Sequence, residues 1–79
     1  MATLGDYMAW IRGIGGKCQT GIASDPTIGM VPVTKIVAPG GRHVIHAGNN
    51  QSERLSLYTI EMFDRRLQVI SPFRSVPRA

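Results

Sequence analysis

The chain has 79 residues, of which 43% are hydrophobic and 18% are charged, and its formal net charge is +4. This balance excludes a disordered chain and fits one globular domain. A domain of this size buries only about 60% of the surface that its unfolded chain exposes, so dimerisation is a natural way to add buried area. The positive charge favours polyanions or an acidic partner, although a modest excess of charge also serves solubility alone.

The sequence carries no sign of a disulfide, a membrane span or a secretion signal. Its one cysteine, Cys18, has no partner for an internal disulfide, and this usage fits a reducing setting. No apolar run approaches the roughly 18–20 residues that cross a membrane. The first residues lack the basic and then apolar pattern of a signal peptide. We therefore expect a cytoplasmic protein without a membrane partner.

The first element in the chain is a predicted helix over 4–14. Thr3 and Asp6 have nearly the spacing of a capping box, which satisfies free N–H groups at a helix start, and apolar residues then recur at helical intervals. The glycines that follow indicate the end of this helix. They follow a helix rather than a strand, which excludes a phosphate-binding loop of the Walker type. A short strand over 17–23 and a loop over 24–29 are expected next.

The clearest element is a β-hairpin over 31–47 with its turn at 39–41. β-Branched residues on both sides of the turn suit a pleated, half-buried surface. The proline of the turn presets its own φ, and the two glycines after it tolerate positive φ. Because Pro32 lacks an N–H group, we expect it at the edge or the start of a strand. The second arm is expected at 42–47.

Apolar residues recur at helical spacing once more in the last third of the chain. With Ser56 or Ser52 as its N-cap, this pattern predicts a second helix over 57–68. A Ser-Pro step then ends the helix, Phe73 is expected to fold back onto the core, and 74–79 is expected to be a flexible tail. The residues that define the helical spacing are Ile60, Phe63, Leu67 and Ile70.

Together these elements predict a single α+β domain over 1–73 with the order α-β-β-β-α. Three antiparallel strands form one sheet, and both helices pack on one of its faces, because this arrangement buries both apolar helical stripes. The other face of the sheet is expected to be exposed or to meet a partner.

Two stretches of the sequence have the pattern of a known family. Gly40-Gly41-Arg42-His43-Val44-Ile45 joins a glycine turn to basic and β-branched residues. Leucine, threonine and spaced apolar residues follow a polar loop: Leu55, Thr59-Ile60, Phe63, Leu67 and Val69. With the element order, these patterns resemble the HicA family, small ribonuclease toxins of bacterial toxin–antitoxin pairs. The resemblance implies a fold similar to the double-stranded-RNA-binding domain.

The resemblance also implies a catalytic histidine on an early strand, before the hairpin turn. That position falls near Pro32-Val33, where this chain has no histidine. His43 and His46 both follow the turn, so the catalytic role of the family is carried over to neither. The resemblance therefore implies a HicA-like protein that has lost its ribonuclease activity, and we predict no catalytic residue.

Neither the histidines nor the cysteine form a promising chemical site. His43 and His46 lie three apart on a predicted strand, so their side chains point to opposite faces, which is poor geometry for one metal ion. Cys18 is a nucleophile only if a histidine converges on it, and burial as a small apolar residue is the stronger expectation. We expect no metal and no cofactor.

The leading hypothesis is a small, non-catalytic domain that binds RNA or a protein partner, such as an antitoxin-like protein. The candidate binding residues are basic side chains that the hairpin and the second helix would present together. Ordinary solvated surface is the alternative for this group. The residues are Lys35, Arg42, His43, Arg65 and Arg66.

Two other functions stay open. A ribonuclease would use His43 or His46 as its general acid or base, since histidine has an unperturbed pKa of about 6.5. A structural accessory protein would form a homodimer through the edge strand expected near 31–37.

Overall fold

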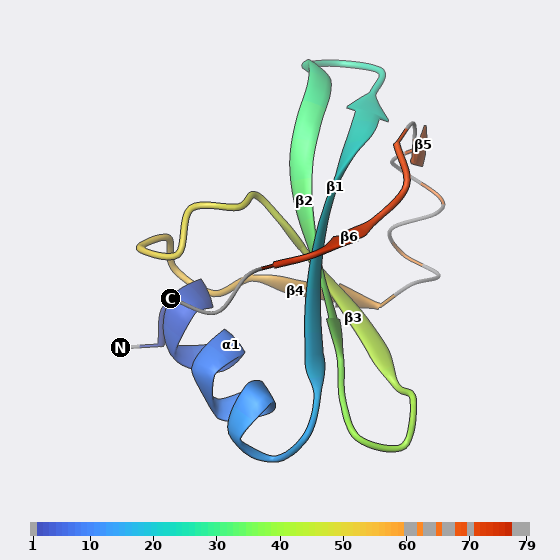
Figure 1. Cartoon of the computed structure of the whole chain (residues 1–79). Coiled ribbons are helices and arrows are strands. Elements are labelled where there is room, and N and C mark those ends of the chain that lie inside the picture. The colour runs from blue at the N-terminus through green and yellow to red at the C-terminus, as the bar shows by residue number, and fades with distance from the viewer. Residues whose placement is uncertain (1, 60–61, 63–64, 66–67, 70, 77–79) are drawn as a thin grey trace.

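Figure 1 shows the computed structural model of the chain, which describes residues 2–59, 62, 65, 68–69 and 71–76. Its elements are α1 (Leu4–Gly13), β1 (Lys17–Asp25), β2 (Gly29–Val37), β3 (His43–Ala47), β4 (Leu57–Thr59), β5 (Gln68–Val69) and β6 (Arg74–Ser75). All strand pairs are antiparallel and form one sheet in the order β4-β3-β2-β1, with β5 and β6 sharing the outer edge of β1. No helix within the described residues is long and apolar enough to cross a membrane.

The predicted first helix is confirmed as α1, which ends one residue earlier than expected. The Thr3 hydroxyl accepts a hydrogen bond from the N–H of Asp6 (3.1 Å), and the Asp6 carboxylate accepts one from the N–H of Thr3 (3.2 Å). These two bonds complete the capping box, so they satisfy donors that a helix leaves free in its first turn. The buried side of the helix consists of Leu4, Met8 and Ile11.

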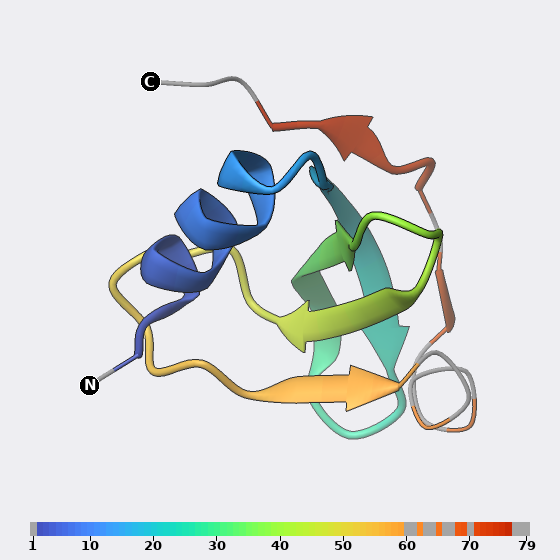
Figure 2. The same cartoon turned by 90° about the horizontal axis from the view of Figure 1, so that it is seen from below.

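The loop between β3 and β4 passes around the start of α1 (Figure 2). The N–H of Leu4 donates to the carbonyl of Glu53, and the N–H of Gly5 donates to the carbonyl of Gln51, both at 2.9 Å. The loop therefore supplies acceptors for two further N–H groups of the first helical turn. In this way it ties the helix to the strands that follow.

The sheet buries apolar side chains on both of its faces. On the face that α1 covers, the helix face, Cys18 and Ile36 pair across β1 and β2 and pack against the helix. On the opposite face, the far face, Ala23, Val33 and Ile45 form a second buried cluster. The molecule thus has two small cores that share one sheet.

Phe73 folds back onto the core, as the sequence predicts, and packs against the buried cluster of the far face. This face was expected to be exposed or to meet a partner, so that expectation is wrong for the part that Phe73 covers. A Cβ atom at Gly21 of β1 would lie 3.1 Å from the Phe73 ring. The missing side chain at Gly21 therefore makes room for the ring. The Lys35 ammonium lies 5.2 Å from the centroid of the same ring, a distance typical of a cation–π contact.

The predicted order α-β-β-β-α is wrong. Residues 57–59, expected to begin a second helix, form β4, in which Tyr58 pairs with Ile45 of β3. Residues 68–69, expected to end that helix, form β5 beside β1. Within the described residues, the fold is α+β with one complete helix, α1, and a sheet five strands wide, in place of the predicted two helices and three strands.

The physical reason for this error is pairing between distant parts of the chain. Leu-Tyr-Thr suits a pleated strand, and the outer edge of β3 offers backbone partners that local spacing does not reveal. Met62 and Arg65 do have helical backbone. The four residues that define the predicted helical spacing lie outside the described residues, namely Ile60, Phe63, Leu67 and Ile70.

The segment expected as a tail, 74–79, begins with paired residues. β6 lies against the first half of β1. The N–H of Val76 then donates to the carbonyl of Cys18 (3.0 Å), and the carbonyl of Val76 accepts from the Arg12 guanidinium (2.9 Å). A strand of two residues has no periodicity of its own, so the sequence could not indicate it. Residues 77–79 lie outside the described part.

The middle of β2 is not an edge of the sheet, in contrast to the expectation for 31–37. Residues 33–37 pair with β1 on one side and with β3 on the other. Residues 29–32 extend past the end of β3 and pair with β1 alone. Pro32 therefore lies where β2 has one neighbour, which confirms the position predicted from its missing N–H group.

Candidate functional site

Two loops rich in glycine, residues 13–17 and 38–43, meet at one end of the sheet. Lys17 at the start of β1 pairs with Val37 at the end of β2, and Val37 pairs with His43 at the start of β3. The two loops therefore lie side by side, at the lower end of the sheet in Figure 1. We call these two loops together the glycine end.

The first loop of the glycine end is held by close packing at Gly16. A Cβ atom on Gly16 would lie 2.6 Å from the carbonyl oxygen of Val37 and would also overlap the Ile11 side chain. The N–H of Gly16 donates to the carbonyl of Ile11 at 2.8 Å. Only glycine lets the chain leave α1 and enter β1 so close to β2.

The second loop forms the predicted turn at 39–41. The N–H of Ala38 donates to the carbonyl of Arg42 (2.8 Å), and the N–H of Gly41 donates to the carbonyl of Ala38 (3.0 Å). Gly40 and Gly41 have φ of +95° and +92°, a backbone region that favours glycine. The turn thus leaves the Arg42 side chain exposed at its end.

Several basic side chains gather at the glycine end. Lys17 and His43 flank Val37 on the far face, and both are exposed. Lys35 lies on the same face two residues before Val37, and Arg42 directly precedes His43. The structure therefore brings together three of the predicted residues, Lys35, Arg42 and His43. It adds Lys17, which sequence reasoning missed because only the strand register places it beside them.

The other two predicted residues do not join this group. Arg65 is exposed, and no described contact connects it to the glycine end. Arg66 lies outside the described residues. Their expected place depended on the second helix, whose predicted boundaries are wrong.

No described carboxylate lies at the glycine end. Asp6 belongs to the capping box at the opposite end of α1, and Asp25, at the far end of β1, accepts a hydrogen bond from the N–H of Thr27. Glu53 lies beside the buried His46, with a carboxylate oxygen 3.6 Å from its Nε2. The cations of the glycine end are therefore uncompensated within the part of the chain that the structure describes.

A hollow with one aromatic side chain in its lining adjoins the same end on the helix face. It has a volume of about 240 Å³ and is bordered by Tyr7, Ala38, Arg42 and Val44, among others. The centroid of the Tyr7 ring lies 5.6 Å from the centroid of the Trp10 ring. Trp10 is the single tryptophan of the chain and is exposed. A flat aromatic group that entered the hollow would therefore contact a tyrosine with an arginine beside it.

His46 is part of the core rather than a surface residue, since only 2% of it is exposed. Its Nδ1 lies 2.9 Å from the carbonyl oxygen of Ser56 and 3.3 Å from the N–H nitrogen of the same residue. Its Nε2 lies 3.6 Å from a carboxylate oxygen of Glu53. The ring joins β3 to the loop that precedes β4, and it is inaccessible to a large substrate.

The Glu53 carboxylate occupies space that is free only because residue 48 is a glycine. A Cβ atom on Gly48 would lie 2.8 Å from a carboxylate oxygen of Glu53. The second carboxylate oxygen accepts from the N–H of Asn50 at 3.1 Å, and the carbonyl of Gly48 accepts from the buried Thr34 hydroxyl at 2.7 Å. This polar network fixes the loop against β2.

The Cys18 thiol is buried on the helix face, as predicted. Burial raises the pKa of the Cys18 thiol, and the charge and hydrogen bond of Arg12 offset this rise in part. A thiol with a raised pKa is a poor nucleophile because the thiolate is the reactive form. Across the described residues, no three His, Cys, Asp or Glu side chains gather as a metal site would require.

Comparison with known proteins returned no family model, no curated protein and no solved structure that matches the chain. The resemblance to the HicA family therefore stays a prediction without support from relatives. The two-helix fold that it implied is corrected above.

Proposed function

We propose that this protein is a non-catalytic domain that binds RNA through the glycine end. The observation that carries the proposal is the register of Lys17, Val37 and His43, which brings Lys17 of one loop beside the Arg42-His43 step of the other, where no described carboxylate competes for these basic side chains. Cations without acidic neighbours attract phosphate groups, and their binding releases the counterions of the nucleic acid. Such contacts position a phosphate backbone without reading its sequence.

The hollow beside Tyr7 favours a single-stranded RNA over a duplex. Bases of single strands stack on aromatic side chains and on arginine, whereas the bases of a duplex are already stacked on each other. Arg42 borders this hollow and also belongs to the cationic loop. One nucleotide can therefore place its base beside Tyr7 while the neighbouring phosphates contact the cations of the glycine end.

The ribonuclease alternative has less in its favour. His46 is 2% exposed, and its ring is engaged with Ser56 and Glu53. His43 is exposed but has no hydrogen-bond partner among the described residues that would orient its ring. General acid–base catalysis needs a positioned proton donor or acceptor, and neither histidine meets this requirement for an RNA substrate.

The test is a titration of a short single-stranded RNA into the protein at low and at moderate salt, followed by Trp10 fluorescence. Lys17→Glu and Arg42→Glu are each expected to weaken binding about tenfold or more and to reduce its salt dependence. Arg54→Glu is the matched control, because it changes the net charge equally but lies beside Thr3 at the opposite end of α1. Absence of binding at low salt, or an equal loss in all three variants, would refute the proposal.

A further inference from the structure

The β1–β2 hairpin projects beyond the body of the molecule, at the upper end of Figure 1. The helix α1 packs against Cys18 and Ile36, which lie toward the other end of the hairpin. β3 reaches only as far as Val33, which it pairs with Ala47. Residues 29–32 and the turn before them therefore lie beyond the reach of both α1 and β3.

This uncovered part of the hairpin carries an apolar surface. Ile22 pairs with Pro32 across the two strands, and Met30 follows on the same face, toward the turn. Exposed fractions are 38% for Ile22, 68% for Met30 and 69% for Ile28 in the turn. We call Ile22, Ile28, Met30 and Pro32 the hairpin patch. It contains no charged residue, and contiguous apolar surface of this kind marks interaction sites.

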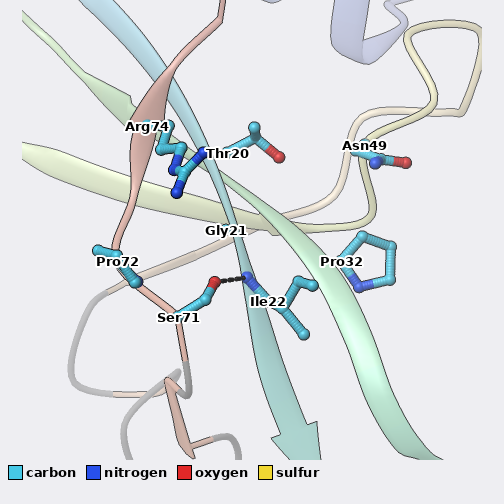
Figure 3. Close-up of a pocket in the computed structure, with 8 residues that line it drawn as sticks. All are labelled: Thr20, Gly21, Ile22, Pro32, Asn49, Ser71, Pro72 and Arg74. Atoms are coloured by element: carbon cyan, nitrogen blue, oxygen red, sulfur yellow. Dashed lines mark hydrogen bonds between the residues drawn. The ribbon is translucent and has the colours of Figure 1, made fainter.

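A groove of about 460 Å³ lies at the base of the hairpin patch. Figure 3 shows Ile22 and Pro32 in the middle of the groove, with Asn49 on one side and the segment of Ser71 and Pro72 on the other. The Ser71 hydroxyl accepts a hydrogen bond from the N–H of Ile22 at 2.8 Å, so this wall is fixed to β1. The groove is thus a preformed recess whose floor is apolar, and Arg74 is the one charged side chain among the described residues that line it.

We propose that a second copy of this chain occupies this groove, with the two hairpins packed face to face in opposite directions. The turn residue Ile28 lies at least three residues, or about 10 Å, along the strands from the Ile22–Pro32 pair. A two-fold axis near the Ser24–Met30 pair therefore places each Ile28 over the groove of the other copy. The same patch serves both copies, as a closed isologous dimer requires.

Charge favours a second copy of the chain as the occupant. The hairpin patch itself is uncharged, and Arg74 is the one charged side chain among the described residues that line the groove, so this surface offers little to a strongly charged partner. The cations of the glycine end begin at Lys17, eight residues along β1 from Asp25 at the tip. That separation is about 26 Å, about three times the Debye length of about 8–10 Å, so the cations of the glycine end hardly oppose association of the tips.

The total exposed area of the chain also favours a second copy as the occupant. The chain exposes 5301 Å² of surface, whereas a monomer of its mass is expected to expose about 4,700 Å². The difference of about 600 Å² approaches the roughly 800 Å² that each partner buries in a stable protein–protein interface.

The first test is the mass of the protein in solution over a hundredfold range of concentration, measured by sedimentation equilibrium. We expect a monomer–dimer equilibrium that Ile28→Glu and Met30→Glu shift to monomer by at least tenfold. Ile14→Glu is the matched control, since Ile14 is a similarly exposed isoleucine at the end of α1. A monomer at every concentration, or a dimer that Ile28→Glu leaves intact, would overturn the proposal.

The second test fixes the arrangement of the two copies. A chain with both Ile22→Cys and Ile28→Cys is expected to form a disulfide-linked dimer on mild oxidation. Within one chain these two positions are about 10 Å apart, beyond the roughly 7 Å limit for a disulfide, so the bond forms only between copies. Each single substitution alone is expected to remain uncrosslinked. A double variant that stays monomeric, or one that forms long oligomers, would contradict the closed dimer.

Discussion

The two ends of the β1–β2 hairpin are built in different ways. At the glycine end, α1 covers Cys18 and Ile36, and the loops around this core carry cations. At the tip, Ile28 and Met30 are exposed, and α1 packs against the other end of the strands. One end therefore buries its apolar side chains and exposes basic ones, whereas the other end exposes apolar side chains. The same pair of strands thus suits two partners of different chemistry, a polyanion and a second copy of the chain.

The largest expected effect tests whether the two ends differ in packing. Ile36→Ala is expected to lower the free energy of unfolding by about 2–5 kcal/mol, because it opens a cavity under α1. Ile22→Ala at the uncovered end is expected to cost less than about 1 kcal/mol in the monomer. Urea denaturation of dilute protein measures both values. Equal losses would mean that the tip is packed like the core.

Two glycine substitutions test how closely the first loop of the glycine end is packed. Gly16→Ala is expected to destabilise the protein by about 1–3 kcal/mol, because the new methyl group would meet the Val37 carbonyl and Ile11. Gly13→Ala is expected to stabilise it by about 0.5–1 kcal/mol, since nothing lies near a Cβ atom there and alanine favours a helix. Thermal unfolding of both variants provides the measurement. A neutral Gly16→Ala would contradict the close approach of the loop to β2.

A third substitution concerns the part of β2 between the two ends. Thr34→Val removes the hydroxyl that donates to the buried carbonyl of Gly48, and we expect a loss of about 1–2 kcal/mol. Thr20→Val is the control, because the Thr20 hydroxyl donates to the carbonyl of Val33 in a less buried place. Hydrogen exchange of the 48–53 loop should rise in the first variant and not in the second. Unchanged exchange would show that the loop is held by other contacts.

The smallest expected effect is a pH dependence at Cys18. Burial raises the pKa of its thiol above the ordinary value of 9.0, so the unfolded chain loses this proton at lower pH than the folded protein. The free energy of unfolding should therefore fall as pH rises above 9.0, by at most about 1.4 kcal/mol per unit for this group. Cys18→Ala should reduce the slope, which denaturation at several alkaline pH values measures. An unchanged slope would assign the pH dependence to other groups.

Local signals in the sequence were sufficient for the first half of the fold. The capping box at Thr3 and the Pro-Gly-Gly turn act within a few residues, and both formed as predicted. The error lies in the last third, where helical spacing predicted a helix from 57 onward. Tyr58 instead pairs with Ile45 of β3, a contact that depends on where that strand lies. Strands as short as β5 and β6 carry no pattern at all.

The candidate site was predictable only where its residues follow one another in sequence. Arg42 and His43 belong to the hairpin turn, so the sequence placed them together. Lys17 joins them through the register of β1 with β2, which no local pattern reveals. Arg65 was assigned to the same group through a helix whose predicted start is wrong. The hairpin patch was missed because its exposure follows from the lengths of α1 and β3.

The most direct test of the difference between the two ends is sedimentation velocity of a short single-stranded RNA mixed with three proteins. These are the natural chain, Lys17→Glu and Ile28→Glu. One experiment reports both the mass of the protein and the amount of RNA that it carries. We predict that Lys17→Glu stays dimeric and loses RNA, whereas Ile28→Glu becomes monomeric and keeps RNA on each chain. If either variant changed both properties, or if neither variant changed any, the division of the hairpin into a polyanion-binding end and a self-associating end would be contradicted.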